Sequence, residues 1–447
     1  MLYNFLPFFV VLALSISVGF FFSKKAKKAS SYFLGDRSLG WFLLMMTFVA
    51  TQVGGGFILG TAEAAFEHGI YGIFYSLGQA LGFLALGLGF GAKLQSLKLN
   101  TASDLFETYY GSRPLKKFAA LLSVISLTGI LIAQAVALKK FMFSLGWNDE
   151  WIFFATWLIV ILYTTQGGFL AVVWTDLLQA TLMIGILLVA FFVTCSQPHT
   201  PLLSESLTSS AASLGAFEPK LLALLVMPFL FMFIEQDMVQ RCFAGKNQKA
   251  VTKGALAASL VLFILAVIPV YFGLLGKSFG VANDQGSKFM QAISLSTNSV
   301  VYTCASCAVL LAIVATSSSL LSAISSNIAN DFVGLSRPRT ITFVTGLVAL
   351  AASTFSSNIF EWMIASYELA VDSLFVPLVF AVFLKSRCQH LSLSAKLSTI
   401  FGSLGFIEAK LITHDPLLAL FLPLLLSLCG YAMGALLANR KKASLPT

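Results

Sequence analysis

The stretch from Ala50 to Ala64, ATQVGGGFILGTAEA, holds the residues of this chain that are best placed to bind a ligand. Three consecutive glycines, Gly54 to Gly56, interrupt an apolar segment that is otherwise long enough to cross a bilayer. A helix that breaks inside hydrocarbon leaves backbone groups unpaired, so the break must be buried in protein or line a wet cavity. There the freed N–H and C=O groups can bind an ion or a small solute. The alternative is a glycine-rich packing face, because small residues also let membrane helices approach closely.

Two acidic residues also lie within apolar segments. Asp176 occurs in TDLLQ and Glu235 in EQDMVQR. Ionisable residues inside membrane spans are costly and are usually functional. The alternative for Asp176 is an interfacial carboxylate that accepts backbone N–H groups near a helix start. The alternative for Glu235 is pairing with Arg241 or with helix-end dipoles.

Composition indicates what kind of element carries these groups. Hydrophobic residues make up 58% of the 447 residues and charged residues 11%, against about 25% charged in soluble domains. No hydrophilic block of domain size occurs, so we expect one all-α polytopic membrane domain over residues 1–447. The basic residues lie in short clusters between apolar spans, so the net charge of +9 does not indicate nucleic-acid binding. The expected surroundings are membrane lipid, and no obligate protein partner is evident.

Apolar runs of about 17–25 residues predict thirteen transmembrane helices. With the N-terminus outside, alternate connections carry most of the 28 lysines and arginines. The positive-inside rule then places these connections and the C-terminus in the cytoplasm, and we expect a bacterial inner (plasma) membrane protein. The predicted helices start near Tyr3, Ser38, Tyr71, Leu115, Trp151, Ala171, Leu221, Val251, Val300, Thr340, Ile359, Ala395 and Pro416.

This topology contains two blocks of five helices that enter the membrane from opposite sides. They cover residues 38–195 and 221–385, with an extra helix at 3–23 before them and two more at 395–438 after them. Such 5+5 inverted repeats occur in transporters whose first helix in each block is broken at mid-membrane. The first block begins with the glycine-bearing helix, and the second begins with a helix that holds Pro228 and then EQDMVQR. The halves share no residue-level similarity, so the repeat rests on topology alone.

Five motifs carry a resemblance to a known family. They are YFLGDRSLGW, ATQVGGGFILGTAEA, YTTQGGFLAVVWTDLLQ, EQDMVQR and TSSSLLSAISSNIAND, and they extend in order over about 300 residues. Together they resemble the sodium:solute symporter family, whose members have a LeuT-type core. Within it, the glycine motif looks most like the branch of high-affinity choline transporters. The resemblance implies Na⁺-coupled import of a small organic solute by alternating access.

The resemblance also implies a sodium site. Na⁺ is a hard cation that takes oxygen ligands. In the family it binds between carbonyls of the first core helix and carbonyl and hydroxyl groups of the eighth. By motif match, the first set falls on Ala50 and Val53. The second set falls on Ala312, Ala315 and Thr316.

One of these positions departs from the family. The family usually has two adjacent hydroxyl residues where this chain has Ala315 followed by Thr316. One ligand is therefore missing, unless Ser317, Ser318, Ser319 or a water replaces it. The alternative is that these hydroxyls only form hydrogen bonds within or between helices.

Two aspartates near the inner ends of predicted helices complete the comparison. In the family, the residue that matches Asp176 lines the cytoplasmic exit path of the ion. Asp331 follows the last turn of the serine-rich helix, where we expect an interfacial cap or a partner for Arg337 or Arg339.

The resemblance indicates less about the solute. The aromatic positions of the choline branch fall on Gln52, Gln79, Ala133 and Glu235, and none of these is aromatic here. A quaternary ammonium needs aromatic faces, so choline is not the expected solute. Three of the four positions carry hydrogen-bonding side chains, and Gln134 adjoins the fourth. Such a pocket suits a small polar organic solute with its own donors and acceptors.

The predicted solute site therefore combines the glycine break with these polar residues. Glu235 is expected to receive an amine of the solute or to carry a proton. The predicted set is Gln52, Gly54, Gly55, Gln79, Gln134, Glu235 and Gln236.

Other function classes have little support. No phosphate loop, Ser-His-Asp order or paired-carboxylate motif occurs, so we expect no enzyme and no organic cofactor, only co-transported Na⁺. Two alternatives stay open. The chain could be a proton-coupled symporter that uses Glu235, or a transceptor that senses a solute without moving it appreciably.

Overall fold

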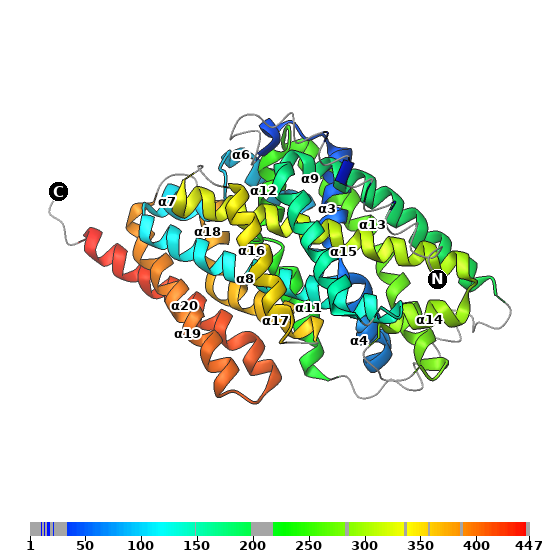
Figure 1. The fold of residues 1–447 in the computed structure, drawn as a ribbon. Coiled ribbons are helices and arrows are strands. Elements are labelled where there is room, and N and C mark those ends of the chain that lie inside the picture. The colour runs from blue at the N-terminus through cyan, green and yellow to red at the C-terminus, as the bar shows by residue number, and fades with distance from the viewer. Residues whose placement is uncertain are drawn as a thin grey trace.

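A computed structural model describes most of the chain. The described residues are 34–147, 149–197, 218–281, 286–334, 338–355, 358–384 and 388–443, with residues 10, 13, 16, 17 and 21 of the N-terminal segment. Most of the predicted helix at 3–23 lies outside them. The described residues form a bundle of helices (Figure 1). The only β-type backbone pairing among these residues is an isolated bridge between Leu39 and Gly245.

The first block begins with a broken helix and continues with long helices. Its elements are η2 (Gly35–Arg37), α3 (Trp41–Gln52), η3 (Gly56–Gly60), α4 (Thr61–His68), η4 (Gly69–Ile73), α5 (Phe74–Ala85), η5 (Leu86–Phe90), α6 (Gly91–Leu97), α7 (Asp104–Tyr110), α8 (Arg113–Ser144) and α9 (Glu150–Cys195).

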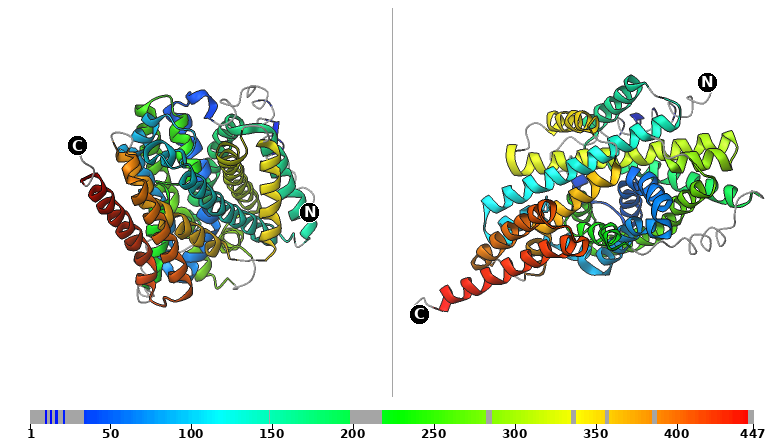
Figure 2. Two further views of the ribbon diagram at one scale, coloured as in Figure 1. Left: turned by 90° about the vertical axis from the view of Figure 1, so that its left-hand side faces the viewer. Right: turned by 90° about the horizontal axis from the view of Figure 1, so that it is seen from below.

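The second block repeats this plan. Its elements are η6 (Pro219–Leu221), α11 (Leu222–Phe231), α12 (Gln236–Ala244), α13 (Gln248–Ser278), α14 (Lys288–Ser296), α15 (Ser299–Ile328), η7 (Ala329–Val333), α16 (Pro338–Ser353), α17 (Ile359–Ala370), η8 (Val371–Phe375) and α18 (Val376–Phe383). After η9 (Gln389–Leu391), α19 (Ser392–Leu411) and α20 (Pro416–Ala443) pack on each other and on η8 along one side of the bundle (Figure 2).

The described helices coincide with most of the predicted spans, although α19, at the start predicted near Ala395, is not among the segments apolar enough to cross a membrane. Eight segments are long and apolar enough to cross a membrane. Two of them, Gly56–Leu97 and Glu150–Cys195, each hold parts of two predicted spans. The shorter helix Trp41–Gln52 is the first half of the span predicted to start near Ser38, and Arg339–Ser353 matches the start predicted near Thr340. Within α9, Gly168 has φ +64° and separates the two predicted spans, because glycine adopts positive φ without strain.

Both predicted breaks are present. Helix α3 ends before Val53, and the chain becomes helical again in the π-helical turns of η3. A Cβ at Gly55 would collide with the Cβ of Ala137 on α8, so glycine serves the close approach of two helices as well as the break. In the second block, α11 ends one turn after Pro228, and α12 starts only after the extended Glu235 (φ −60°, ψ 120°).

The most enclosed segment of the bundle is α15 with η7, whose most apolar window is 94% buried inside the molecule. It packs on α3, α8 and α9. We call the end of the bundle where α6, α7 and α12 are labelled in Figure 1 the inner end, because the connections near it carry most of the basic clusters. The opposite end, where α4 and α14 are labelled, is the outer end.

Candidate functional site

A chain of hydrogen-bonded polar side chains crosses the centre of the bundle between the two broken helices. Gln52 Nε2 donates to Glu235 Oε2 at 3.0 Å, and Gln79 Nε2 donates to Gln52 Oε1 at 2.7 Å. Gln79 Nε2 also lies 2.9 Å from the Tyr75 hydroxyl, which lies 3.0 Å from the Tyr367 hydroxyl. All five side chains are buried. The structure therefore brings three of the predicted solute-site residues into direct contact.

The two tyrosines were not part of the predicted site. Their rings stack 6.4 Å apart, and the Phe231 ring lies 4.6 Å from that of Tyr367. Thus aromatic groups approach the polar chain from α5 and α17, although none occurs at the four aligned positions. Tyr75 precedes Gln79 by one helical turn and so shares its face, which is a signal the sequence offered. Tyr367 had no comparable signal.

The glycine break adjoins this chain. The backbone N–H of Gly55 donates to Gln134 Oε1 at 2.8 Å, and Gln134 is 1% exposed. A buried unpaired N–H is costly, so the Gln134 amide satisfies a group that the break frees. Gly54, Gly55 and Gln134 therefore lie together as predicted from the sequence.

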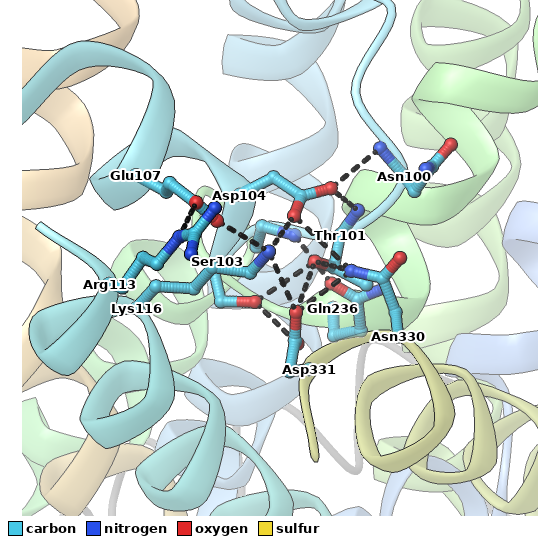
Figure 3. Close-up of polar contacts among 11 residues, drawn as sticks. Asn100, Thr101, Ser103, Asp104, Glu107, Arg113, Lys116, Gln236, Asn330 and Asp331 are labelled. Carbon is cyan, nitrogen blue, oxygen red and sulfur yellow. Dashed lines mark hydrogen bonds and ion pairs between the residues drawn. The ribbon is translucent and has the colours of Figure 1, made fainter. Parts of the chain in front are cut away.

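Gln236 does not join this group. Its side-chain Oε1 accepts the backbone N–H of Ala102 at 2.7 Å, in the connection between α6 and α7 at the inner end (Figure 3). The structure therefore does not bring the side chain of Gln236 together with the other predicted solute-site residues, and its contact with a solute stays a prediction. At the start of a half-helix, successive side chains point in different directions, so adjacency to Glu235 did not place Gln236 in the same pocket.

A second carboxyl that the sequence analysis did not select lies beside Glu235. Asp237 is fully buried next to the Glu235 carboxyl, close enough for the two side chains to hydrogen-bond. Arg241 does not neutralise Glu235 by an ion pair, because its guanidinium binds Asp176 instead. Two buried carboxyls thus lie side by side at the start of α12.

The predicted sodium ligands flank the break from α3 and α15. The Thr316 hydroxyl donates to the Ala50 carbonyl at 3.3 Å, and a Cβ on Gly54 would lie 2.5 Å from Thr316 Oγ1. Val53 and Ala312 are also buried. The geometry brings one predicted carbonyl and the predicted hydroxyl together. Binding of Na⁺ to these oxygens stays a prediction.

The residues at and after Ala315 form contacts within and beside α15. The Ala315 methyl group packs with Met46, Ala50 and Ala180. Ser317 and Ser318 donate to backbone carbonyls one turn back in α15, at 2.6 and 2.9 Å. Each of these hydroxyls donates its proton within the helix and keeps its oxygen lone pairs, so replacement of the missing ligand by one of them stays a prediction.

Asp176 lies in a buried polar cluster between α3, α9, α12 and α15. Its Oδ2 accepts from Thr47 Oγ1 at 2.5 Å and from Arg241 Nη2 at 3.2 Å. Arg241 Nε also donates to Thr47 at 2.9 Å, and Nη2 donates to Ser319 at 2.7 Å. Thr47 and Ser319 each lie one helical turn on the inner side of Ala50 and Thr316. Asp176 is therefore an ion-paired residue in the interior of α9 and not a carboxylate at a helix start.

A cavity of about 630 Å³ opens at the outer end. Its lining includes Glu63 and Lys140, which form an ion pair at 2.9 Å, and Glu361 and Phe360 of α17. The Phe360 ring also lies 5.0 Å from the ring of Tyr75. The volume is in the range of small-molecule sites. Phe360 thus stands between this cavity and the buried polar chain.

Comparison with known proteins identifies the family. A model of the sodium:solute symporter family matches residues 32–395. The chain belongs to the sodium:solute symporter family. The chain is 27% identical over 415 residues to the sodium/sialic acid symporter SiaT of Proteus mirabilis, covering 84% of this chain and 81% of that protein. It is 28% identical over 348 residues to the sodium/proline symporter of Haemophilus influenzae, covering 69% and 67%.

Other comparisons refine this assignment. High-affinity choline transporter 1 of Caenorhabditis elegans is 32% identical over 148 residues, which is 33% of this chain and 25% of that protein. Among solved structures, a substrate-bound, outward-open Na⁺-coupled sialic acid symporter matches with a TM-score of 0.77 at 18% identity, covering 96% of both chains. The amino-acid complex of MhsT matches with a TM-score of 0.56 at 13% identity, covering 89% of this chain and 99% of that one. The fold is the LeuT-type fold.

The comparisons agree with the Na⁺-coupled solute transport that the motif resemblance implied for this chain. The chain is an integral membrane protein and a secondary transporter that couples movement of an organic solute to Na⁺. Its family is one of transporters.

Proposed function

We propose that this symporter imports a small organic solute that carries a protonated amine, together with Na⁺. The observation that carries the proposal is the buried Glu235 carboxyl, which ends the polar chain and lies beside Asp237. A buried carboxylate needs a compensating charge. The Arg241 guanidinium is already paired with Asp176. An amine of the solute is the partner whose charge and hydrogen-bonding capacity fit Glu235.

The other groups around Glu235 favour a particular kind of amine. The amides of Gln52 and Gln79 and the hydroxyl of Tyr75 offer donors and acceptors. A primary or secondary ammonium can donate to Glu235 and to such acceptors, whereas a trimethylammonium cannot donate. Solutes that carry only a carboxylate are disfavoured by repulsion from the two carboxyls. We therefore expect amines to be preferred over choline and over simple organic acids.

The coupling ion binds, in this proposal, between α3 and α15. Its ligands are the carbonyl oxygens of Ala50, Val53 and Ala312 and the hydroxyl of Thr316, with Ala315 adding no hydroxyl. The 3.3 Å approach of Thr316 Oγ1 to the Ala50 carbonyl supports this set. An ion held there would join the inner half of a broken helix to α15, at the kind of unwound-helix position where such transporters bind ions.

The proposed route runs from the outer cavity past Phe360 to the polar chain, and then to the inner end. Asp176 would line the exit of the ion, since it lies one turn further in than the sodium ligands. The proposal also includes a bacterial inner membrane, an N-terminus outside and a cytoplasmic C-terminus, supported by the distribution of basic residues.

Proton coupling is a second candidate because of one observation. Asp237 is buried beside Glu235, and the two carboxyls are close enough to hydrogen-bond. Two adjacent carboxyls can share one proton. A proton would then occupy the position that we assign to the amine.

A thermal-shift screen tests the proposal. Purified protein in lipid nanodiscs is heated with a panel of amines, amino acids and organic acids, in NaCl or KCl. We expect amine-bearing solutes to raise the melting temperature only with NaCl. Glu235→Gln should lose the response to amines and keep the response to NaCl alone. Stabilisation by carboxylates without an amine, or an unchanged amine response in Glu235→Gln, would overturn the amine assignment. Uptake into proteoliposomes that follows a pH gradient and ignores Na⁺ would favour the proton.

A further inference from the structure

Gln236 links the solute site to the inner end of the molecule. Its neighbour in the sequence, Glu235, ends the polar chain, whereas Gln236 Oε1 accepts the backbone N–H of Ala102 at 2.7 Å (Figure 3). Gln236 is fully buried and Ala102 is 4% exposed. One peptide unit at the start of α12 therefore connects the predicted solute contact to the connection formed by residues 98–103.

That connection is held on its other side by a charged cluster. Lys116 Nζ at the start of α8 lies 2.7 Å from Asp104 and 3.6 Å from Asp331. Ser103 Oγ donates to Asp331 at 2.6 Å, and the backbone N–H of Thr101 donates to Asp104 at 3.1 Å. Asp331 thus binds this connection and Lys116 and serves as more than an interfacial cap. The cluster joins α7, α8 and η7 around residues 98–103.

The same connection also reaches the far end of α12. Arg37 donates to the carbonyls of Lys98 and Leu99 at 2.8 and 2.9 Å, and to the carbonyl of Phe243 at 3.3 Å. The backbone N–H of Lys246 donates to the Leu39 carbonyl at 2.9 Å. Residues 98–103 therefore bind α12 at its first residue through Gln236 and near its last turn through Arg37.

We propose that Gln236 is a positioning residue that keeps α12 against residues 98–103 and so holds the inner end closed. Residues 232–235 before α12 are not helical, so α12 can move as a unit about this break. It leaves the connection only when the bond from Ala102 to Gln236 is broken. Since Glu235 and Gln236 share a peptide unit, a solute that moves Glu235 also moves Gln236. This last step rests on the proposed role of Glu235.

Amide hydrogen exchange measures this closure directly. Wild type and Gln236→Leu are compared by mass spectrometry in nanodiscs, with NaCl or KCl and no solute. The peptides followed are 98–112, which holds the bonded N–H, and 243–247, which lies at the far end of α12. We expect Gln236→Leu to raise exchange about tenfold in both peptides, because the closure opens as one unit. A rise confined to the 98–112 peptide would overturn the proposal, since it would show only a local loss of one bond.

Two further variants make the test independent of how well Gln236→Leu folds. Lys116→Met leaves Gln236 intact but releases residues 98–103 from the other side, so we expect faster exchange in the same two peptides. The control is Arg113→Gln, because the Arg113 side chain is 84% exposed and pairs with Glu107 at the surface, where ion pairs contribute little. Exchange in Lys116→Met that matches the Arg113→Gln control would also overturn the proposal.

The outcomes separate this proposal from the proposed function. Slow exchange at 243–247 in Gln236→Leu, with a normal amine response in the thermal-shift screen, contradicts only the positioning role. Fast exchange at both peptides with no response to any amine contradicts only the amine assignment. The exchange measurement itself uses no solute, so it does not depend on finding the transported molecule.

Discussion

Replacing Thr316 with valine removes one oxygen from the predicted sodium site while nearly preserving side-chain shape. Thr316 Oγ1 lies 3.3 Å from the Ala50 carbonyl oxygen, and the residue is 5% exposed. The hydroxyls of Ser317 and Ser318 donate to carbonyls of their own helix. These bonds fix the positions of the two serine oxygens within α15.

The size of the effect follows from the strength of contacts to a charged partner. Such a contact contributes about 1.5–3 kcal/mol, and about 1.4 kcal/mol corresponds to a tenfold change in binding. We therefore expect Thr316→Val to raise the Na⁺ dissociation constant about ten- to a hundredfold. Thr316→Ser is the matched control, because it keeps the hydroxyl. Ala315→Ser should have the opposite effect and lower the constant, since it adds a hydroxyl where Ala315 packs on Ala50.

The assay is the melting temperature of each variant in nanodiscs as NaCl replaces KCl at constant ionic strength. A ligand that binds only the folded protein stabilises it by RT ln(1 + [L]/Kd). The NaCl concentration at which melting begins to rise therefore reports the dissociation constant. Identical NaCl curves for the valine, serine and wild-type proteins would refute the assignment of the Thr316 hydroxyl as a ligand.

Three further substitutions test other parts of the site. Gly55→Ala should lower Na⁺-driven uptake at least about tenfold, because the added Cβ would collide with Ala137. The double variant Gly55→Ala with Ala137→Gly should recover part of the uptake. A fully active Gly55→Ala variant would contradict the need for close approach of the two helices. Glu235→Gln should weaken binding of an amine solute by about 1–3 kcal/mol, measured by thermal shift or calorimetry, and unchanged affinity contradicts a direct contact. Arg241→Met leaves the Asp176 carboxylate without its ion-pair partner and should lower the free energy of unfolding by about 3–5 kcal/mol. In denaturation measurements, the double variant Arg241→Met with Asp176→Leu should recover most of that loss. A double variant as unstable as Arg241→Met alone would refute the pairing argument.

The sequence predicted those features that depend on backbone chemistry in the bilayer. Three adjacent glycines in an apolar span indicate a break, and the structure has one at Val53 to Gly55. Apolar run lengths located the helix starts because the bilayer fixes the length of a span. The sequence indicated that the break frees backbone groups that need partners, but it did not indicate that Gln134 accepts the N–H of Gly55.

The features that the sequence did not predict depend on side-chain direction and on distant contacts. Tyr367 reaches the polar chain from α17, which follows Tyr75 by almost three hundred residues, and no local pattern marks that meeting. Gln236 turns away from its neighbour Glu235 because α12 starts there, so each successive side chain points about 100° further around the axis. Asp237 lies beside Glu235 because Glu235 is extended and precedes the helix, and no pattern in the sequence marked that contact.

The ion pair of Arg241 with Asp176 has an electrical consequence. Arg241 belongs to α12, whereas Asp176 belongs to α9. If α12 moves relative to α9 during the transport cycle, Arg241 moves together with the Glu235 and Asp237 carboxyls, and a net negative charge moves through part of the membrane potential when both carboxyls are ionised. A full elementary charge crossing 100 mV corresponds to about 2.3 kcal/mol. Reorientation of the carrier without any solute or Na⁺ would then carry a transient current, and membrane voltage would set the balance between its outward-facing and inward-facing forms.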